Sequence, residues 1–408
     1  MRLVYVTVAM PFGPDEAFIV PEIVEIQKRG HRVTVVPLRP QSGMPHGDAR
    51  PLIAVAEPLL SWGIVAGAIA ELWRAPLLSA RTARLLLASR SAGVLLKNLA
   101  VLPKGLWLAR LARKQRIDHI HAHFASTTAT VALIASRVSG VPWSFTAHRW
   151  DITDNNLIDC KLQSAAFGRA IDRRGAQELA TYAPASEHKL RIIHMGVASH
   201  VVQPEKDDVP DRMLRVIVGA RFDEMKGHRY AIESIARLKR AGVNVSLDCA
   251  GLGSLQGTLE TYATSLAVAD RVHFPGLIDH GRFLTELARR RWDVALLPSL
   301  EQDREREGIP VFLIEAMAAG IPVVATNTGG IPELLEGGAG IIVPQRDAGA
   351  ITEALTFLAA DADRRVRLAF AGRERVRAHF TIEGAITALL DEIFPAVREE
   401  KAATACAQ

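Results

Sequence analysis

Short apolar runs alternate with longer amphipathic stretches along most of the chain. Leu3 to Ala9 and Arg32 to Pro37 are apolar runs of strand length, and a helical pattern from Glu16 to Arg29 lies between them. Gly30 follows this pattern in the position of a helix C-cap. Strand, helix and strand at this spacing predict a βαβ unit and a parallel sheet.

The alternation continues with a strand at His119 to His123, a helix at Ser126 to Val138 and a strand at Pro142 to Ala147. A polar stretch from Ala198 to Arg212 has the composition of a linker. The α/β rhythm then resumes, with strands expected at Leu214–Val218, Val245–Ala250, Arg271–Phe274, Val294–Leu297, Val323–Ala325 and Gly340–Val343.

The pattern therefore predicts an α/β protein with two Rossmann-like, doubly wound domains that face each other across a cleft. We place the N-terminal domain at 1–197 and the C-terminal domain at 213–380. Residues 381–408 are expected to be a C-terminal helix, near Thr381 to Glu399, that crosses back to the first domain and is followed by a tail. Ligands of such sheets bind beyond the carboxyl ends of the strands.

Residues 41–115 depart from this rhythm because they are long, apolar and helical in character. Leu52 to Trp73 is as apolar as a membrane span, but it contains Glu57, Pro58 and Glu71, so amphipathic helices are favoured over a span. The apolar start of the chain is similarly read as a buried strand rather than as a signal peptide, because it lacks a small-residue cleavage pattern.

Composition narrows the class of protein. Apolar residues make up 49% and charged residues 23% of the chain, which is typical of a globular protein. The cysteines, Cys160, Cys249 and Cys406, form no C-x-x-C pair, which favours a reducing, cytoplasmic location. Aromatic residues are scarce at 6%, and no basic-aromatic motif is present, which argues against nucleic acid as a partner.

The net charge of +5 is unevenly distributed. The segment from Trp73 to Ile117 has no acidic residue and ten basic ones, which are Arg74, Arg81, Arg84, Arg90, Lys97, Lys104, Arg110, Arg113, Lys114 and Arg116. Two interpretations stay open: ordinary solvated helix faces, or a patch that docks on an anionic membrane surface. The second would place the protein peripherally on the inner membrane face, with a lipid-linked acceptor.

Three segments of the second half carry candidate chemistry. Arg221 and Lys226 lie in a loop that joins a strand to a helix near Gly227, where two cations and free backbone N–H groups would suit a diphosphate. Glu307 precedes a helix that begins near Pro310, and Glu315 lies in its second turn. These carboxylates could accept hydrogen bonds from sugar and ribose hydroxyls, whereas a structural salt bridge is the plainer alternative for Glu315.

The third segment is Thr328-Gly329-Gly330-Ile331-Pro332-Glu333. Its paired glycines follow a strand and would let backbone N–H groups approach a ligand closely; a tight strand-to-helix turn is the alternative.

Together these residues resemble the large glycosyltransferase family numbered four, whose members have the GT-B architecture and retain anomeric configuration, and within it the subgroup that builds exopolysaccharides such as colanic acid. The match rests on Arg221, Lys226, the pair Glu307 and Glu315, and the run from Glu315 to Ala325. The resemblance implies that Arg221 and Lys226 hold the donor diphosphate, with Gly329 and Gly330 near the phosphates.

It further implies that Glu307, with Gly308 and Ile309, contacts the donor sugar and that Glu315 binds the nucleotide ribose. Many relatives have Gly-Phe-Gly after the first glutamate, where this chain has Gly308-Ile309-Pro310, so the donor sugar cannot be read from the motif.

In the first half, Phe145-Thr146-Ala147 is followed by His148, which by the same resemblance contacts the donor sugar and is, with Glu307, a candidate catalytic residue. The opening loop with Gly13 and Glu16, and His123 at the end of the neighbouring strand, are predicted on the acceptor side.

No metal is expected. His121 and His123 have no further ligand at fitting spacing, and Asp361-Ala362-Asp363 falls in a predicted surface turn. The predicted function is transfer of a sugar from a nucleotide-diphosphate donor, such as a UDP- or GDP-sugar, to a saccharide or lipid-linked acceptor, without a cofactor.

Two rivals share the architecture: an epimerase of nucleotide sugars, and a degenerate partner protein that binds a nucleotide sugar without catalysis. A dinucleotide enzyme is disfavoured because Gly251-Leu252-Gly253 lacks the third glycine at its place.

Overall fold

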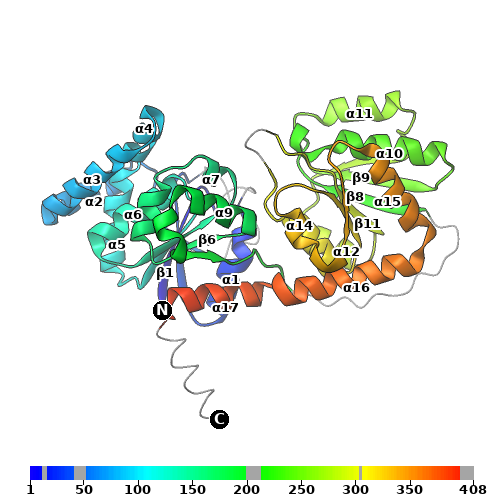
Figure 1. Ribbon diagram of the computed structural model, residues 1–408. Helices are drawn as coiled ribbons and strands as arrows, with labels where there is room; N and C mark the ends of the chain where they lie inside the picture. Colours follow the sequence, from blue (N-terminus) through cyan, green and yellow to red (C-terminus); the bar gives the residue numbers. More distant parts are fainter. Residues whose placement is uncertain (12–15, 41–51, 199–212, 303–305, 396–408) are drawn as a thin grey trace, which may run out of the picture. The chain divides into compact units, whose positions relative to one another are not determined.

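The computed structural model describes residues 1–11, 16–40, 52–198, 213–302 and 306–395. The chain divides into two compact units, shown in Figure 1. The first contains Met1–His194 and the segment from Ile382 onward, and the second contains Met195–Thr381. The predicted linker lies almost wholly outside the described residues, which resume at Met213.

Each unit has a parallel sheet, as the alternation of strands and helices predicts. In the described residues, the first sheet has the strand order β3-β2-β1-β4-β5-β6-β7 and the second β10-β9-β8-β11-β12-β13. The order reverses beside β1 in the first sheet and beside β8 in the second, as in doubly wound folds. The predicted α/β class with two Rossmann-like sheets is confirmed.

The strands of the first unit are β1 (Arg2–Thr7), β2 (Arg32–Pro37), β3 (Ile53–Ala54), β4 (His119–His123), β5 (Trp143–Ala147), β6 (Gly168–Ala170) and β7 (Leu190–Ile192). Its helices are α1 (Val20–Lys28), α2 (Trp62–Arg74), α3 (Pro76–Leu85), α4 (Ala92–Ala100), α5 (Leu102–Lys114), α6 (Thr127–Ser139), α7 (Trp150–Thr153), α8 (Ile158–Ser164), α9 (Arg173–Tyr182) and α17 (Ile382–Ile393). The sequence pattern did not predict the short strands β3, β6 and β7, because two or three residues are too few to display a period.

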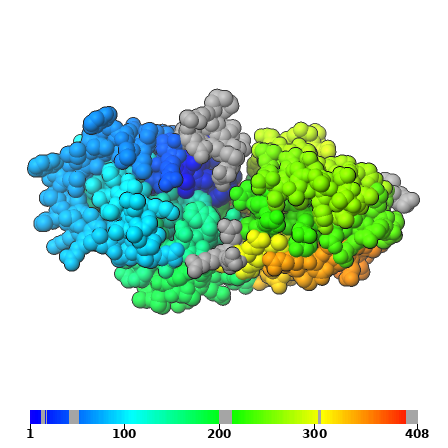
Figure 2. Space-filling model, turned by 90° about the horizontal axis from the view of Figure 1, so that it is seen from above, coloured from blue at the N-terminus to red at the C-terminus, as the bar shows by residue number. Residues whose placement is uncertain are grey.

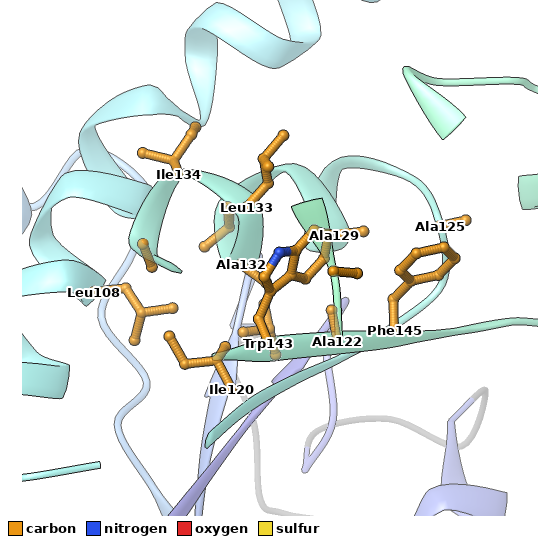
Figure 3. Close-up of a cluster of buried hydrophobic side chains, with 14 of the residues drawn as sticks. Leu108, Ile120, Ala122, Ala125, Ala129, Ala132, Leu133, Ile134, Trp143 and Phe145 are labelled. Carbon is orange, nitrogen blue, oxygen red and sulfur yellow. The ribbon is translucent and has the colours of Figure 1, made fainter. Parts of the chain in front are cut away.

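The core of the first unit forms where β4 and β5 meet α5 and α6. Every residue of both strands is buried, as expected for parallel strands covered on both faces. Trp143 and Phe145 alternate with polar residues on β5 and point toward the small side chains of α6, including Ala129 and Ala132 (Figure 3). The indole N–H of Trp143 is satisfied by Ser164 at 3.1 Å.

The segment Leu52 to Trp73, which is as apolar as a membrane span, does not form one long helix. Within Leu52 to Trp73, the helix α2 begins only at Trp62, so it is shorter than the roughly 20 residues that a crossing requires. By length and composition alone, the continuous stretch Ala92–Lys114 qualifies as a span, but 39% of it is buried inside the protein.

The basic stretch is less uniformly available than its sequence suggested. Lys104 is fully buried, and its ammonium donates to the carbonyl oxygens of Pro37 and Glu57 at 2.5 and 2.8 Å. Burial lowers the pKa of Lys104 to about 8. Arg74 and Arg113 both pair with the buried carboxylate of Glu71. These three residues therefore serve the fold, which corrects the expectation of ten comparable surface cations.

The strands of the second unit are β8 (Leu214–Gly219), β9 (Val245–Ala250), β10 (Val272–Gly276), β11 (Val294–Leu297), β12 (Val323–Thr326) and β13 (Ile341–Val343). Its helices are α10 (His228–Arg240), α11 (Gln256–Ser265), α12 (His280–Ala288), α13 (Val311–Ala318), α14 (Ile331–Leu334), α15 (Ala348–Ala360) and α16 (Ala362–His379). The motif expected in a surface turn begins a helix, because the Asp361 carboxylate caps α16 through the backbone N–H of Arg364 at 2.7 Å.

The last described helix, α17, belongs to the first unit. Its buried residues Ile386 and Leu389 join Ile19 and Ile23 of the opening helical segment in one apolar cluster. Arg29 at the end of α1 reinforces this contact by donating to the hydroxyl of Thr387 at 2.8 Å.

The crossing of α5 and α6 gives a sharp test of packing. A β-carbon on Gly105 would lie 2.6 Å from the β-carbon of Ile134, whereas one on Gly93 in α4 would meet nothing within 4 Å. Both substitutions raise helix propensity, so Gly93→Ala should be neutral or stabilising by up to ~1 kcal/mol. Gly105→Ala should instead destabilise by about 1–3 kcal/mol, as measured by urea unfolding. Equal stability of the two variants would contradict this packing.

Candidate functional site

The phosphate-side loop of the second unit is shaped by glycines that bring backbones into contact. A β-carbon on Gly227, which has a φ of +64°, would lie 2.0 Å from the carbonyl oxygen of Pro298. A β-carbon on Gly253 would lie 2.4 Å from the carbonyl oxygen of Phe222. The loop between β8 and α10 therefore lies directly on the ends of β9 and β11, and it brings Lys226 to the carboxyl edge of the sheet.

Lys226 and Glu307 meet at this edge. Their ammonium and carboxylate groups are 2.5 Å apart, and both side chains are largely buried. The hydroxyl of Ser299, at the end of β11, donates to the same carboxylate oxygen at 2.7 Å. Thr326 in turn donates to the carbonyl oxygen of Ser299 at 2.5 Å, so the carboxylate is held by residues from three segments.

The paired glycines pack on the segment that follows Glu307. A β-carbon on Gly329, whose φ is +54°, would lie 1.8 Å from the carbonyl oxygen of Glu307. One on Gly330 would lie 2.7 Å from Ile309 and 3.1 Å from the backbone of Gly308. Only glycine permits this approach, so the structure brings together five of the predicted donor residues.

Glu315 has a partner that the sequence did not indicate. Its carboxylate contacts Nε2 of His280, the first residue of α12, at 2.7 Å. The Glu315 side chain is 10% exposed and that of His280 is 41% exposed, so the pair reaches the surface. Glu315 therefore has a side-chain partner, as the structural alternative predicts. Its role in binding the ribose stays a prediction.

Among the described residues of this edge, Arg221, Thr328 and His228 lack strong partners. The Arg221 side chain is 66% exposed and its contact with Asp223 is 3.4 Å. The hydroxyl oxygen of Thr328 is sealed from solvent without a hydrogen bond, and so are both ring nitrogens of His228. Burial lowers the pKa of His228 to about 4. An exposed cation and an unsatisfied hydroxyl beside the Gly329 turn are groups that a polar ligand could satisfy.

In the first unit, His148 ends a buried chain of polar groups. Nε2 of His148 lies 3.2 Å from Nδ1 of His123, and Nε2 of His123 lies 3.3 Å from the carboxylate of Glu22. Glu22 also accepts from Tyr5 at 2.9 Å and from Arg169 at 2.7 Å. All five side chains are buried.

The charge of this chain fixes its proton positions. Burial raises the pKa of Glu22, but Arg169 and His123 together outweigh it and hold that pKa well below its usual range. The Glu22 carboxylate is therefore ionised and can only accept hydrogen bonds. His123 therefore donates from Nε2 to Glu22, and its Nδ1 lies 3.2 Å from Nε2 of His148.

A second buried pair holds the loops that follow β4 and β5. The carboxylate of Asp151 accepts from the backbone N–H groups of Ala125, His148 and Arg149 at 2.7 to 3.1 Å. The Lys161 ammonium donates to the carbonyl oxygens of Ala125 and Ser126, both at 2.8 Å. His148 is thus fixed through its backbone as well as through its ring.

The predicted acceptor-side residues are distributed unevenly. Glu16 is buried, and its carboxylate accepts from the backbone N–H groups of Val8, Ala9 and Met10 at 2.5 to 2.9 Å, which shapes the loop after β1. His123 lies inside the buried chain rather than at the surface. Gly13 lies outside the described residues.

Glu22, His121 and His123 bring potential metal-ligand atoms within 4.8 Å of one another. Both ring nitrogens of His121 already contact hydroxyls, those of Ser144 at 2.7 Å and Thr146 at 2.8 Å. A cation would have to displace these contacts and the Arg169 guanidinium. The residues present fit a hydrogen-bond network better than a metal centre, and the absence of a metal stays a prediction.

Comparison with known proteins identifies the domain that carries the second site. Residues 203–375 match the family model described as "Glycosyl transferases group 1". This segment is similar to that family, and we refer to it as the group 1 domain. Lys226, Glu307, Glu315 and Gly329 all lie inside it.

Two curated relatives each match about half of the chain. The putative colanic acid biosynthesis glycosyltransferase WcaL of Escherichia coli K12 is 37% identical over 195 residues, which are 47% of this chain and 48% of WcaL. The amylovoran biosynthesis glycosyltransferase AmsK of Erwinia amylovora is 34% identical over 197 residues, 47% of each chain. This chain spans about half the length of the curated relatives it matches. The resemblance to exopolysaccharide glycosyltransferases is confirmed for the group 1 domain.

The fold extends the likeness to both units. The crystal structure of HepE from Anabaena in complex with UDP superposes with a TM-score of 0.70 at 15% identity, over 96% of this chain and 99% of HepE. At this identity the likeness shows the fold alone, and it confirms the GT-B architecture.

Several residues of both sites escaped the sequence analysis: Glu22, Asp151, Lys161, Arg169, His280 and Ser299. Glu22 gave one signal, since it lies among apolar residues on the buried face of α1. Arg169 lies in a three-residue strand and His280 pairs across 35 positions, so neither had a local pattern to reveal it.

The buried histidines predict how stability depends on pH. Burial lowers the pKa of His119 to about 3, and it lowers the pKa values of His121 and His148 well below the usual value. The unfolded chain takes up protons near pH ~6.5 that the folded chain refuses, so stability falls as pH drops below that value. Each histidine contributes up to roughly 1.4 kcal/mol per pH unit.

Urea unfolding between about pH 4.5 and 7 should therefore show a steep loss of stability on the acid side. His119→Gln keeps a hydrogen-bonding group for Ser144 and should lower the slope by one histidine's share. His188→Gln, at an exposed position of the same unit, is the control and should leave the slope unchanged. Identical slopes for the His119 variant and the wild type would refute the assignment.

Proposed function

We propose that this chain is a retaining glycosyltransferase of the family numbered four, which moves a sugar from a nucleotide-diphosphate donor to a saccharide or lipid-linked acceptor. The group 1 domain supports the class of reaction. The relatives named for colanic acid and amylovoran biosynthesis support a role in polysaccharide assembly. The complex of HepE with UDP supports a nucleotide-sugar donor.

The observation that carries the proposal is the arrangement of Glu307 between Lys226 and Gly329. A charged pair of this kind is costly to bury unless the site uses it, and the glycine turn holds it against the sheet edge. In the proposed complex the donor sugar contacts Glu307, Gly308 and Ile309. The diphosphate binds Arg221, Lys226 and the N-terminus of α10, and it brings Lys226 a second anionic partner.

The proposed reaction needs no metal, because two cations and a helix N-terminus meet the charge that develops on the diphosphate. The bond between the anomeric carbon and the diphosphate oxygen breaks, and its electron pair leaves with the diphosphate. The acceptor hydroxyl bonds to the same face of that carbon and passes its proton to the leaving diphosphate. His148 makes a hydrogen bond through Nδ1 to a donor-sugar hydroxyl.

Two other functions would use the same fold. An epimerase would change the nucleotide sugar without consuming an acceptor, and a degenerate partner would bind it unchanged. Analysis of the reaction products distinguishes both functions from sugar transfer. The intact Lys226–Glu307 pair favours catalysis over degeneration.

A donor titration tests the proposal. UDP- and GDP-sugars, added with a chelator, should raise the melting temperature of the wild type, because a ligand of the folded state stabilises it. Glu315→Gln should weaken nucleotide binding about 10- to 100-fold, since it removes a charged acceptor of ribose hydroxyls. Glu353→Gln, at an exposed position of α15 in the same unit, is the matched control. Binding that is equal in both variants, or absent throughout, would count against the assignment.

We further propose that the acceptor is reached at an anionic membrane, on whose cytoplasmic face the enzyme docks peripherally. The described residues contain twenty exposed large apolar side chains, and eleven of them lie between residues 53 and 99: Ile53, Leu60, Trp62, Ile69, Leu72, Trp73, Leu77, Leu78, Leu87, Leu96 and Leu99. This segment forms the lighter blue part of the surface at the left of Figure 2. Exposed apolar groups at this density favour an apolar partner.

The remaining cations supply the complementary charge. Arg81, Arg84, Arg90 and Lys97 are exposed among the same helices, and each would contribute about 1 kcal/mol near an anionic lipid surface. Tryptophans with exposed indoles are typical of the interface between lipid and water. The apolar and basic groups together support docking better than the basic stretch did alone.

The apolar contribution is testable by sedimentation with vesicles of phosphatidylcholine and phosphatidylglycerol at low salt. Trp62 is 87% exposed and Trp73 84% exposed, so Trp62→Ser with Trp73→Ser should leave the fold intact. Binding should weaken by roughly tenfold or more for each tryptophan. Phe370→Ser, a 61% exposed aromatic of the second unit, is the control and should bind normally. Wild-type protein that stays in the supernatant would rule out the docking.

A further inference from the structure

The carboxyl edge of the first sheet carries an aromatic surface that the proposed chemistry does not use. Trp150 begins α7, two residues after His148, and is 41% exposed. Its indole stacks on the ring of Phe124 with centroids 5.5 Å apart and planes 23° apart. The Phe124 ring lies 4.6 Å from that of His148. We call Phe124 and Trp150 the aromatic shelf.

The shelf is held in place rather than left mobile. Phe124 has a φ of +71°, a left-handed conformation that costs a non-glycine residue about 1–3 kcal/mol and persists only where the surroundings impose it. Its N–H donates to Thr146 at 2.8 Å, and the Thr128 hydroxyl donates to its carbonyl oxygen at 2.8 Å. Asp151 binds the backbone on both sides, at Ala125 and Arg149.

Exposure sets Trp150 apart in its unit. Outside residues 53–99, the exposed large apolar side chains in the described part of the first unit are Met1, Trp150 and Ile192. Trp150 is the aromatic one among them, and it stands at the edge where parallel sheets bind ligands. An indole with one face on Phe124 and a large exposed fraction is suited to a ligand that has an apolar face and polar edges.

The polar group beside the shelf is Nδ1 of His148. The structure gives it no hydrogen bond within the described residues, whereas Nε2 of the same ring lies 3.2 Å from Nδ1 of His123. A ring nitrogen can accept a hydrogen bond from a hydroxyl or donate one to it, depending on the tautomer. An aromatic wall beside an oriented polar group is the composition of a small-ligand site.

We propose that the aromatic shelf is the acceptor subsite, where the C–H face of a pyranose ring stacks on Trp150. This inference rests on the proposed function in one respect: transfer requires the acceptor hydroxyl beside the donor sugar, and His148 is the donor-sugar contact that adjoins the shelf. The shelf itself suggests the ligand class, a pyranose. The C–H face of the ring matches the indole of Trp150, and the ring's hydroxyls match Nδ1 of His148.

The test uses the full chain labelled with 5-fluorotryptophan, and the probes are the methyl glycosides of glucose, galactose, mannose and fucose. Fluorine resonances are assigned from single Trp→Phe variants. We expect the Trp150 resonance to move with at least one methyl glycoside, at millimolar affinity typical of a single small ligand, while the exposed Trp62 and Trp73 stay fixed. Glycerol, which has hydroxyls but no ring face, should move none of them.

Two results would overturn the proposal: a Trp150 resonance that no pyranoside moves, or equal movement of all three exposed tryptophans. Trp150→Ala and Trp150→Phe add a second readout, because pyranoside binding should be lost in the first and largely kept in the second. Nucleotide-sugar binding should be unchanged in both. A shelf that binds pyranosides in a chain that binds no nucleotide sugar would sustain the subsite and refute the transferase.

Discussion

The ion pair between Glu22 and Arg169 is the interaction on which the first unit's site depends. Neither charge could remain buried without the other, and the Glu22 carboxylate also accepts from His123. His123 in turn contacts His148 through one hydrogen bond. Asp151 and Lys161 form a second buried charged group nearby, which fixes the backbone of the loops. Charge balance inside the protein thus orients the His148 ring.

In the second unit, close backbone contacts hold the polar groups of the site in place. Gly227 and Gly329 lie so near to carbonyl oxygens of Pro298 and Glu307 that no side chain would fit, and each glycine ties one loop to the next. Lys226 and Glu307 therefore meet because two loops are locked together, not because they are near in sequence. The two units use different physical means to hold polar groups at the carboxyl ends of parallel strands.

The sequence predicts a feature of the fold or site when the residues that form it are close together in the chain, and fails when they are far apart. The strands β2, β4, β9 and β11 have the predicted limits, because four to six residues are enough to form a local pattern. Glu307 and Glu315 were found because they share one helix motif. Arg169 and His280 were not, because their partners lie 147 and 35 positions away. The apolar surface of residues 53–99 was also missed, since a sequence shows apolar content but not which side of a helix is covered.

The position of α17 has a consequence for how the molecule is made. The first unit is discontinuous, because Ile386 and Leu389 complete the apolar cluster around Ile23 only after all of the second unit has been synthesised. On the ribosome, the group 1 domain can therefore close its core while the N-terminal unit still exposes part of its own. The core of the first unit therefore depends on α17, which is made only after the second unit.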